Sequence, residues 1–83
     1  MRYKVNLSKK AKKQLSKLKK SDQERVVAVL ERARFRPRRY ATQLSMNKYF
    51  RLRAGSFRMI IDIQDAIMLI LVIEVDKRDK IYK

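Results

Sequence analysis

The sequence predicts a small α+β domain with two helices packed on one face of a mainly antiparallel sheet. A strand-like alternation at the amino terminus is followed by two amphipathic segments, and three strand-like segments close the chain. The expected order is therefore β-α-α-β-β-β, with an amino-terminal helical hairpin. A chain of 83 residues buries only about 60 % of its unfolded surface, which suits one core. We therefore expect a single domain over residues 1–83.

The amino terminus is expected to form a strand and then a helix. Arg2–Leu7 alternates apolar and polar residues, the period of a half-buried strand. Ser8 is a suitable N-cap for a helix that runs to Lys19 or Lys20. Its apolar residues recur every three or four positions, as on one helix face: Leu7, Ala11, Leu15 and Leu18.

A second helix is expected from Ser21. The letters "SDQE" form a Ser-x-x-Glu capping box and place Asp22 and Glu24 in the first turn, where the helix dipole favours acids. This helix is expected to end by Arg36, because a residue before proline avoids the α region. The apolar face consists of Val26, Val29, Leu30 and Ala33.

The second half of the chain is expected to be rich in strands. The stretch "RPRRYATQLSMNK" holds neither period for long and is interpreted as a basic connector with a short irregular strand at Ala41–Leu44. Three strands follow, separated by turns at residues 54–56 and 64–66: Tyr49–Arg53, Phe57–Ile63 and Ile67–Val75. The last is almost wholly apolar, as a central strand covered on both faces would be.

The charge indicates a polyanionic partner. Lysine and arginine number 23 against 8 acids, a formal charge of +15, which favours nucleic acid through counterion release. Residues 1–20 hold nine positive charges and no acid. Such a run of positive charges can simply be a solvated face, or it can bind RNA phosphates. The candidate RNA-binding residues are Lys9, Lys10, Lys12, Lys13, Lys17, Arg53, Lys77 and Lys80.

Several classes of function are excluded or disfavoured. The chain has no cysteine and no histidine, so it lacks disulfides, thiolate zinc sites and a histidine base. No metal and no cofactor are expected. The longest apolar run, Ala66–Ile73, is far shorter than the roughly 20 residues of a membrane span. Without a signal-peptide pattern, a cytoplasmic location is expected.

The stretch "YFRLRAGSFRMIIDI", residues 49–63, predicts a hairpin with arginines on one face. Pairing Leu52 with Phe57 and Phe50 with Met59 gathers the apolar side chains on the core face. Arg51 then lies opposite Arg58 on the other face. Opposed like charges are unfavourable, so an anion between them would stabilise the pair. In this register Arg53 falls in or beside the turn.

The chain resembles the RelE/ParE superfamily of toxins from prokaryotic toxin-antitoxin pairs. The resemblance spans nearly the whole chain and rests on the R-L-R-x-G-x-[FY]-R pattern within the hairpin, the apolar strand "AIMLILVIEV" and the ending "DKRDKIY". It implies a RelE-like fold, and for the RelE branch a ribosome-dependent endoribonuclease that cleaves mRNA in the A site. It also implies an acidic RelB-like antitoxin as partner, together with the ribosome and its rRNA.

The resemblance also implies roles for four residues. Arg51 corresponds to a basic catalytic residue on the first hairpin strand, and Arg58 to the arginine that stabilises the transition state. Arg78 matches the basic residue after the central strand. Tyr82 matches a carboxy-terminal tyrosine that stacks on a base and assists the leaving group.

The general base stays open at the level of sequence. The RelE pattern has two lysines on the first hairpin strand where this chain has Tyr49 and Arg51, and its spacing between the residues matching Arg78 and Tyr82 is longer. Arginine keeps its proton, so Lys48, Tyr49 or Tyr82 are candidate bases, with Lys48 and Tyr49 as supporting residues. Alternatively, the ribosome orients the messenger for in-line attack and the toxin mainly stabilises charge.

Two other functions are compatible with the same sequence. The ParE branch poisons DNA gyrase through protein–protein contacts and would not need Arg78 and Tyr82 for catalysis. A noncatalytic RNA-binding module would need only the basic surface, and leaves the expected opposition of Arg51 and Arg58 without a purpose.

Overall fold

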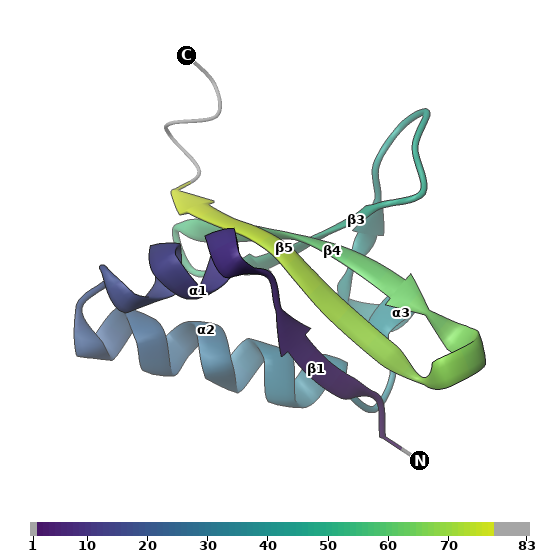
Figure 1. Cartoon of the computed structure of the whole chain (residues 1–83), viewed down its shortest axis with the longest axis horizontal. Helices are drawn as coiled ribbons and strands as arrows, with labels where there is room; N and C mark the ends of the chain where they lie inside the picture. The colour runs from purple at the N-terminus through teal and green to yellow at the C-terminus, as the bar shows by residue number, and fades with distance from the viewer. Residues whose placement is uncertain (1, 78–83) are drawn as a thin grey trace.

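The structure, a computed structural model, describes residues 2–77. Figure 1 shows the elements of this range. The helical ones are α1 (Lys9–Ser16), α2 (Lys20–Ala33), α3 (Pro37–Tyr40) and a 3-10 turn, η1 (Asp65–Ile67). The strands are β1 (Lys4–Leu7), β2 (Thr42–Gln43), β3 (Phe50–Ala54), β4 (Phe57–Gln64) and β5 (Leu69–Lys77).

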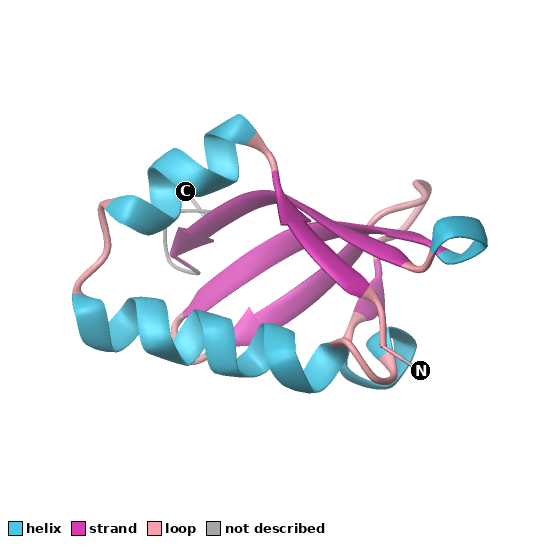
Figure 2. Cartoon of the chain, turned by 60° about the horizontal axis from the view of Figure 1, so that its bottom comes forward, coloured by secondary structure: helices cyan, strands magenta, loops and turns pink. Residues whose placement is uncertain are grey.

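The five strands form one sheet in the order β1-β5-β4-β3-β2. Only β1 and β5 run parallel, and the other neighbours are antiparallel. Figure 2 shows α1 and α2 on the same side of the sheet, which confirms the expected α+β architecture. The core between them and the sheet includes Ala11, Val26, Leu30, Leu52, Met59, Ile61, Ile70 and Val72.

Helix α1 covers the edge of β5 beyond the end of β1. Ser8 is the N-cap, as predicted: its Oγ accepts a hydrogen bond from Ala11 N at 3.0 Å and donates one to Ile73 O at 2.7 Å. The Oε1 of Gln14 accepts a bond of 2.7 Å from Val75 N. The helix therefore satisfies backbone groups that would otherwise lie open at a strand edge. It ends at Ser16, three residues before the predicted Lys19.

The expected capping box of the second helix does not form. Helix α2 begins one residue before Ser21, and its N-cap, Lys19, makes no side-chain capping bond. The turn is held from inside the helix, because Gln23 Nε2 donates hydrogen bonds of 3.0 and 3.1 Å to Leu15 O and Leu18 O. Bonds from a side chain of α2 to the segment just before it stabilise this start, in place of a side-chain cap.

The basic connector is more regular than the sequence indicated. Pro37 opens the four-residue helix α3, a position that tolerates proline because its missing N–H would have no helical partner. The short strand expected at Ala41–Leu44 is present as β2, which pairs Thr42 with Arg51 and Gln43 with Phe50.

The hairpin register differs by two residues from the prediction. Ala54 lies opposite Phe57 and Arg53 opposite Arg58, whereas Arg51 lies opposite Ile60. The predicted pairing of Arg51 with Arg58 is therefore wrong. The cause is a two-residue turn with Gly55 at φ +63°, the first central position of a type II′ turn. A shift of two keeps every side chain on its predicted face, so the assignment of faces is confirmed.

A β-bulge in β5 decides which of its residues are buried. Ile60 pairs with Glu74 and Ile61 with Val72, which leaves Ile73 as the extra residue. Strict alternation from Val72 would have directed Glu74 toward the core, whereas the bulge buries Val75 instead. The face without α1 and α2 carries half-buried Leu71, so the prediction that this strand is buried on both faces is wrong.

Three segments distant in the chain meet at Asp65. Arg38 donates two hydrogen bonds to its carboxylate, at 2.8 and 2.7 Å, and the Tyr3 hydroxyl donates a third at 2.6 Å. These bonds, chiefly those from Arg38, lower the pKa of Asp65 from 3.8 to about 2. The bond to Asp65 in turn raises the pKa of Tyr3. We call this set of three side chains the Asp65 clamp.

No helix in residues 2–77 has the length and apolar character that crossing a membrane requires.

Candidate functional site

Three arginines lie on the face of the sheet opposite α1 and α2. Arg51 and Arg53 alternate with the buried Leu52 on β3, and Arg58 alternates with the buried Phe57 and Met59 on β4. The register places Arg53 directly across from Arg58, with Arg51 two positions farther along. We call Arg51, Arg53 and Arg58 the arginine face. Arg53, which the sequence analysis had placed in or beside the turn, is therefore part of this group.

Arg51 has an unusual environment. Its Nε atom is buried, and it has no hydrogen-bond partner among the residues that the structure describes. A buried donor without a partner costs about 1–3 kcal/mol, and more when it is charged. An anion that accepted a hydrogen bond from the Arg51 guanidinium would offset this cost.

Arg58 sits at the centre of the arginine face. Its side chain is half-buried, with Arg53 across from it on β3 and Asp76 across from it on β5. Asp76 reaches this position because of the bulge at Ile73. The sequence analysis did not include Asp76, since no signal in the apolar run marks the extra residue. Asp76 is a carboxylate beside the predicted transition-state arginine.

The two predicted supporting residues lie at the start of β3. Tyr49 is half-buried, and its alternation with Phe50 puts it on the side of Arg51. Lys48 lies in the loop between β2 and β3, which projects from the body of the molecule (Figure 1). Its Nζ is 5.5 Å from the centroid of the Tyr49 ring, a cation–π distance.

Lys48 belongs to a different hollow from the arginine face. It lines a pocket of about 550 Å³ with Arg38, Phe50, Asp62 and three other residues, and neither Arg51 nor Arg58 is among them. This pocket lies where β4 extends past its pairing with β3, which ends at Ile61. The structure therefore places Lys48 beside Tyr49 but outside the group formed by Arg51, Arg53 and Arg58.

Of the predicted residues at the carboxy-terminal end, the structure describes Lys77 alone. Arg78, Lys80 and Tyr82 lie outside the described residues, so their convergence with Arg58 stays a prediction. Lys77 is exposed at the end of β5, opposite Phe57.

The lysines of α1 are exposed, as a phosphate-binding surface requires. Lys10 Nζ forms an ion pair with Glu74 Oε1 at 2.9 Å. The other four have no ion pair within residues 2–77 and are open to an external anion: Lys9, Lys12, Lys13 and Lys17.

The chemistry of the arginine face is that of anion binding. Arginine offers a planar fork of donors that matches two phosphate oxygens and retains its charge. In the described part of the chain, no three acidic side chains gather as metal ligands. The arrangement on the sheet is suited to hold a phosphate and to stabilise additional negative charge on it.

Comparison with known proteins bears on the fold. No protein-family model and no curated protein matches the sequence. The solved structures similar to it include a chain of the toxin–antitoxin complex RelBE2 from Mycobacterium tuberculosis, with a TM-score of 0.85 and 23 % identity over 94 % of this chain and 100 % of that chain. A chain of the archaeal RelE–RelB complex from Pyrococcus horikoshii has a TM-score of 0.79 and 21 % identity, covering 94 % and 97 %.

The isolated RelE toxin of E. coli is also similar, with a TM-score of 0.78 and 24 % identity over 96 % of this chain and 90 % of that chain. At identities below 25 %, these likenesses concern the backbone arrangement, which in each case covers nearly the whole of both chains. The chain described here has the fold of the RelE toxins.

Proposed function

We propose that this protein is the toxin of a type II toxin–antitoxin pair and acts as a ribosome-dependent mRNA endoribonuclease. The arginine face carries the proposal. It presents three arginines on the face of a RelE fold opposite α1 and α2, and the Nε of Arg51 is buried without a hydrogen-bond partner in residues 2–77. The basic surface of α1 suits the rRNA around an A site.

The proposed reaction is attack of a 2′-hydroxyl on the adjacent phosphate. The O2′–P bond forms, the P–O5′ bond breaks, and the proton of the 2′-hydroxyl must leave while the departing 5′-oxygen gains one. Arg58 stabilises the charge that develops on the phosphorane, because a guanidinium fork binds two of its oxygens. Arg51 and Arg53 bind the same group from β3.

The origin of the base is part of the proposal. Arginine does not deprotonate, so the arginine face supplies charge stabilisation and not proton abstraction. We assign orientation of the messenger to the ribosome, with Tyr49, Lys48 and Tyr82 as candidates for proton transfer. The consequence is little cleavage of RNA without ribosomes.

The proposed partner is an acidic antitoxin of the RelB type. The chain carries a formal charge of +15, and an acidic partner that covered the arginine face would neutralise charge and block phosphate access together. The similar structures from M. tuberculosis and P. horikoshii are complexes of toxins with antitoxins. The ribosome and mRNA as targets imply action in the cytoplasm.

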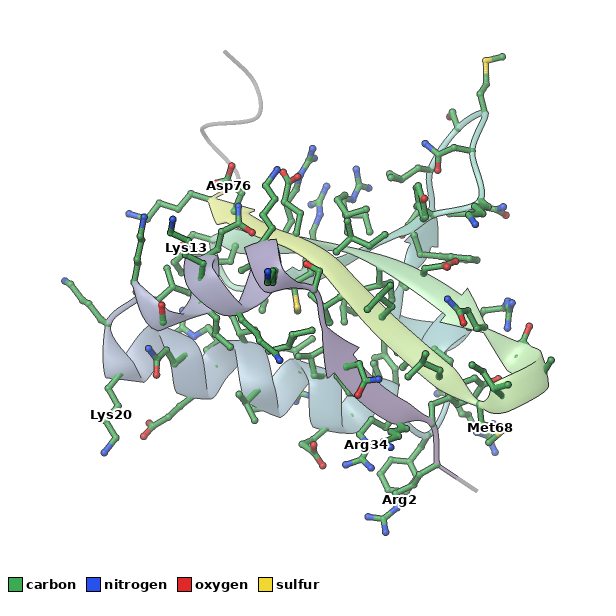
Figure 3. All side chains as sticks on the ribbon, viewed as in Figure 1. Arg2, Lys13, Lys20, Arg34, Met68 and Asp76 are labelled. Carbon is green, nitrogen blue, oxygen red and sulfur yellow. The ribbon has the colours of Figure 1, made fainter. Side chains whose placement is uncertain are left out.

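The decisive experiment adds the purified protein to a translating extract and maps messenger ends by primer extension. Arg58→Ala should reduce the cleavage rate by about 10²- to 10³-fold, the usual effect of losing one electrostatic donor in an active site. Arg2→Ala is the matched control, since it removes an exposed arginine from the amino-terminal end of the chain, seen in Figure 3 beyond β1. It should cleave like the parent.

Three results would contradict the proposal. Cleavage by Arg58→Ala at the parental rate would exclude a catalytic arginine face. Arrest of gyrase on DNA, without messenger cleavage by the parent, would indicate a ParE-like gyrase inhibitor. Inhibition of translation without new messenger ends would indicate a noncatalytic RNA-binding module.

A further inference from the structure

A second concentration of arginines lies where α2 gives way to α3. It surrounds an open pocket of about 450 Å³ lined by Glu31, Arg32, Phe35, Arg36, Arg39 and Tyr40. We call it the arginine–aromatic pocket. All six residues come from α2, α3 and the link between them, so the pocket shares no residue with the arginine face.

Two aromatic side chains of the pocket are exposed to solvent. Phe35 is 57 % and Tyr40 48 % exposed, although large aromatic side chains usually contribute to a core. Their positions are fixed by the backbone, because Ala33 and Pro37 on either side of Phe35 are buried. The protein therefore holds two aromatic rings at its surface on a rigid support.

The cations of the pocket differ from their neighbours in having no acidic partner. Arg34 pairs with Glu31 at 3.1 Å, and Arg38 pairs with Asp65. Arg32, Arg36 and Arg39 are exposed and form no ion pair within residues 2–77. The pocket is therefore lined by three guanidinium groups without an ion pair in this range, two aromatic rings and the carboxylate of Glu31.

The composition of this pocket distinguishes it from a groove for an amphipathic helix. A hollow between β1 and α2 is lined largely by aliphatic residues, including Val5, Leu7, Leu15 and Val27, as a helix-binding groove would be. The arginine–aromatic pocket has no aliphatic lining residue. Aromatic faces combined with guanidinium groups are the means by which proteins bind unpaired nucleotides, through stacking on the base and contact with the phosphate.

We propose that the arginine–aromatic pocket binds an unpaired nucleotide of RNA. The base stacks on Phe35, the more exposed of the two rings, and the flanking phosphates contact Arg32, Arg36 and Arg39. This site is independent of cleavage at the arginine face. It gives the protein a preference for single-stranded over fully paired RNA that the lysines of α1, which contact phosphates alone, do not provide.

The test measures binding of a short fluorescent single-stranded RNA to the full chain by anisotropy, without ribosomes and over a range of salt concentrations. Phe35→Leu keeps an apolar side chain but loses the ring, and should weaken binding about 5- to 150-fold, the range for loss of base–aromatic stacking. The salt dependence should not change. Arg39→Gln should weaken binding and make the slope of log K against log salt shallower by about 0.7.

Two control variants come from the same helix. Val27→Ala truncates a side chain that is 46 % exposed and lines the aliphatic hollow. Lys20→Gln removes a charge at the end of α2 remote from Arg34, as Figure 3 shows. Both should bind within about twofold of the parent. Thermal unfolding is measured for each variant, to check that each, and Phe35→Leu above all, remains folded.

The proposal is overturned if Phe35→Leu and Arg39→Gln both bind single-stranded RNA like the parent. It is also overturned if Phe35→Leu weakens binding to a fully paired RNA as much as to a single strand. If Phe35→Leu loses as much affinity for poly-glutamate as for single-stranded RNA, the pocket binds an acidic polypeptide instead. Because the assay needs neither ribosomes nor cleavage, its result does not depend on the proposed ribonuclease activity.

Discussion

Arg53 and Arg58 form a pair of like charges that is unfavourable for the stability of the sheet. They lie directly opposite each other on β3 and β4, and like charges in this geometry destabilise a sheet. Arg51 adds a buried donor without a partner in the described range. Neutral side chains at Arg51 and Arg53 would avoid these costs, whereas Arg58 has Asp76 across from it on β5. Under the proposed function, a phosphate bound at the arginine face would relieve both costs.

Arg53→Gln should therefore raise the stability of the free protein. We expect a gain of about 0.2–1 kcal/mol in the free energy of unfolding, because the opposition to Arg58 is relieved. Urea denaturation at low and high salt measures this gain, which should shrink as salt screens the charges. Lys12→Gln is the control for simply lowering the net charge, and the gain of Arg53→Gln should exceed it. Equal gains would contradict the argument.

At the scale of the element, the β3–β4 hairpin depends on its two-residue turn. Gly55 has φ +63°, and a Cβ there would lie 2.7 Å from Arg25 Cδ and Nη1. The turn sets the register that places Arg53, and not Arg51, across from Arg58. Helix α1 is similarly tied to the sheet by Ser8 and Gln14, which bind backbone atoms around the bulge. The turn and the bulge together determine the layout of the arginine face.

Gly55→Ala should destabilise the protein by roughly 1–2 kcal/mol, the cost of a left-handed conformation for an L-residue. Arg25 can move aside at little further cost, since the contact involves the far end of a flexible side chain. Chemical denaturation gives the measurement. Ser56→Ala, at the other central position of the turn and without positive φ, should change stability by much less. A similar loss in both variants would show that the backbone conformation of Gly55 is not the cause.

At the scale of the whole molecule, the Asp65 clamp joins the amino-terminal segment, α3 and the turn between β4 and β5. It connects Tyr3 before β1, Arg38 in α3 and Asp65 in the turn before β5. The backbone adds a second connection, because Tyr3 N donates to Arg34 O and Arg34 Nε donates to Tyr3 O, both at 2.8 Å. These contacts fix the link between α2 and α3, and with it the arginine–aromatic pocket, relative to the sheet.

The clamp predicts acid sensitivity. The pKa of Asp65 is about 2 in the folded protein against an ordinary 3.8. A lowered pKa contributes stability above the ordinary value, and this contribution is lost as pH falls from about 4 toward 2. Asp65→Asn should therefore be less stable than the parent at neutral pH, and the difference should narrow over that range. Unfolding midpoints at several pH values measure it.

Glu24→Gln is the matched control for the clamp, because it removes an exposed acid of α2 that forms no ion pair within residues 2–77. A constant difference between parent and Asp65→Asn from neutral pH down to about 2 would contradict a stabilising role for the ionised carboxylate.

The sequence by itself determined the fold class, the identity and order of the main elements and the faces of the hairpin. Periodicity of two or near four residues in segments such as Arg2–Leu7 depends on local geometry alone, so it is visible in the letters. The face of each arginine also followed, since alternation with buried Leu52 and Met59 fixes it whatever the register.

The tertiary structure decided which residues meet. The bulge at Ile73 depends on a small free-energy difference between neighbouring registers, and contacts between distant segments settle it, such as that of Ser8 with Ile73. The turn at Gly55 placed Arg53 across from Arg58, and the bulge at Ile73 brought Asp76 beside Arg58. Turn geometry and contacts between distant segments, which the periodicity of the letters does not encode, therefore set the layout of the arginine face.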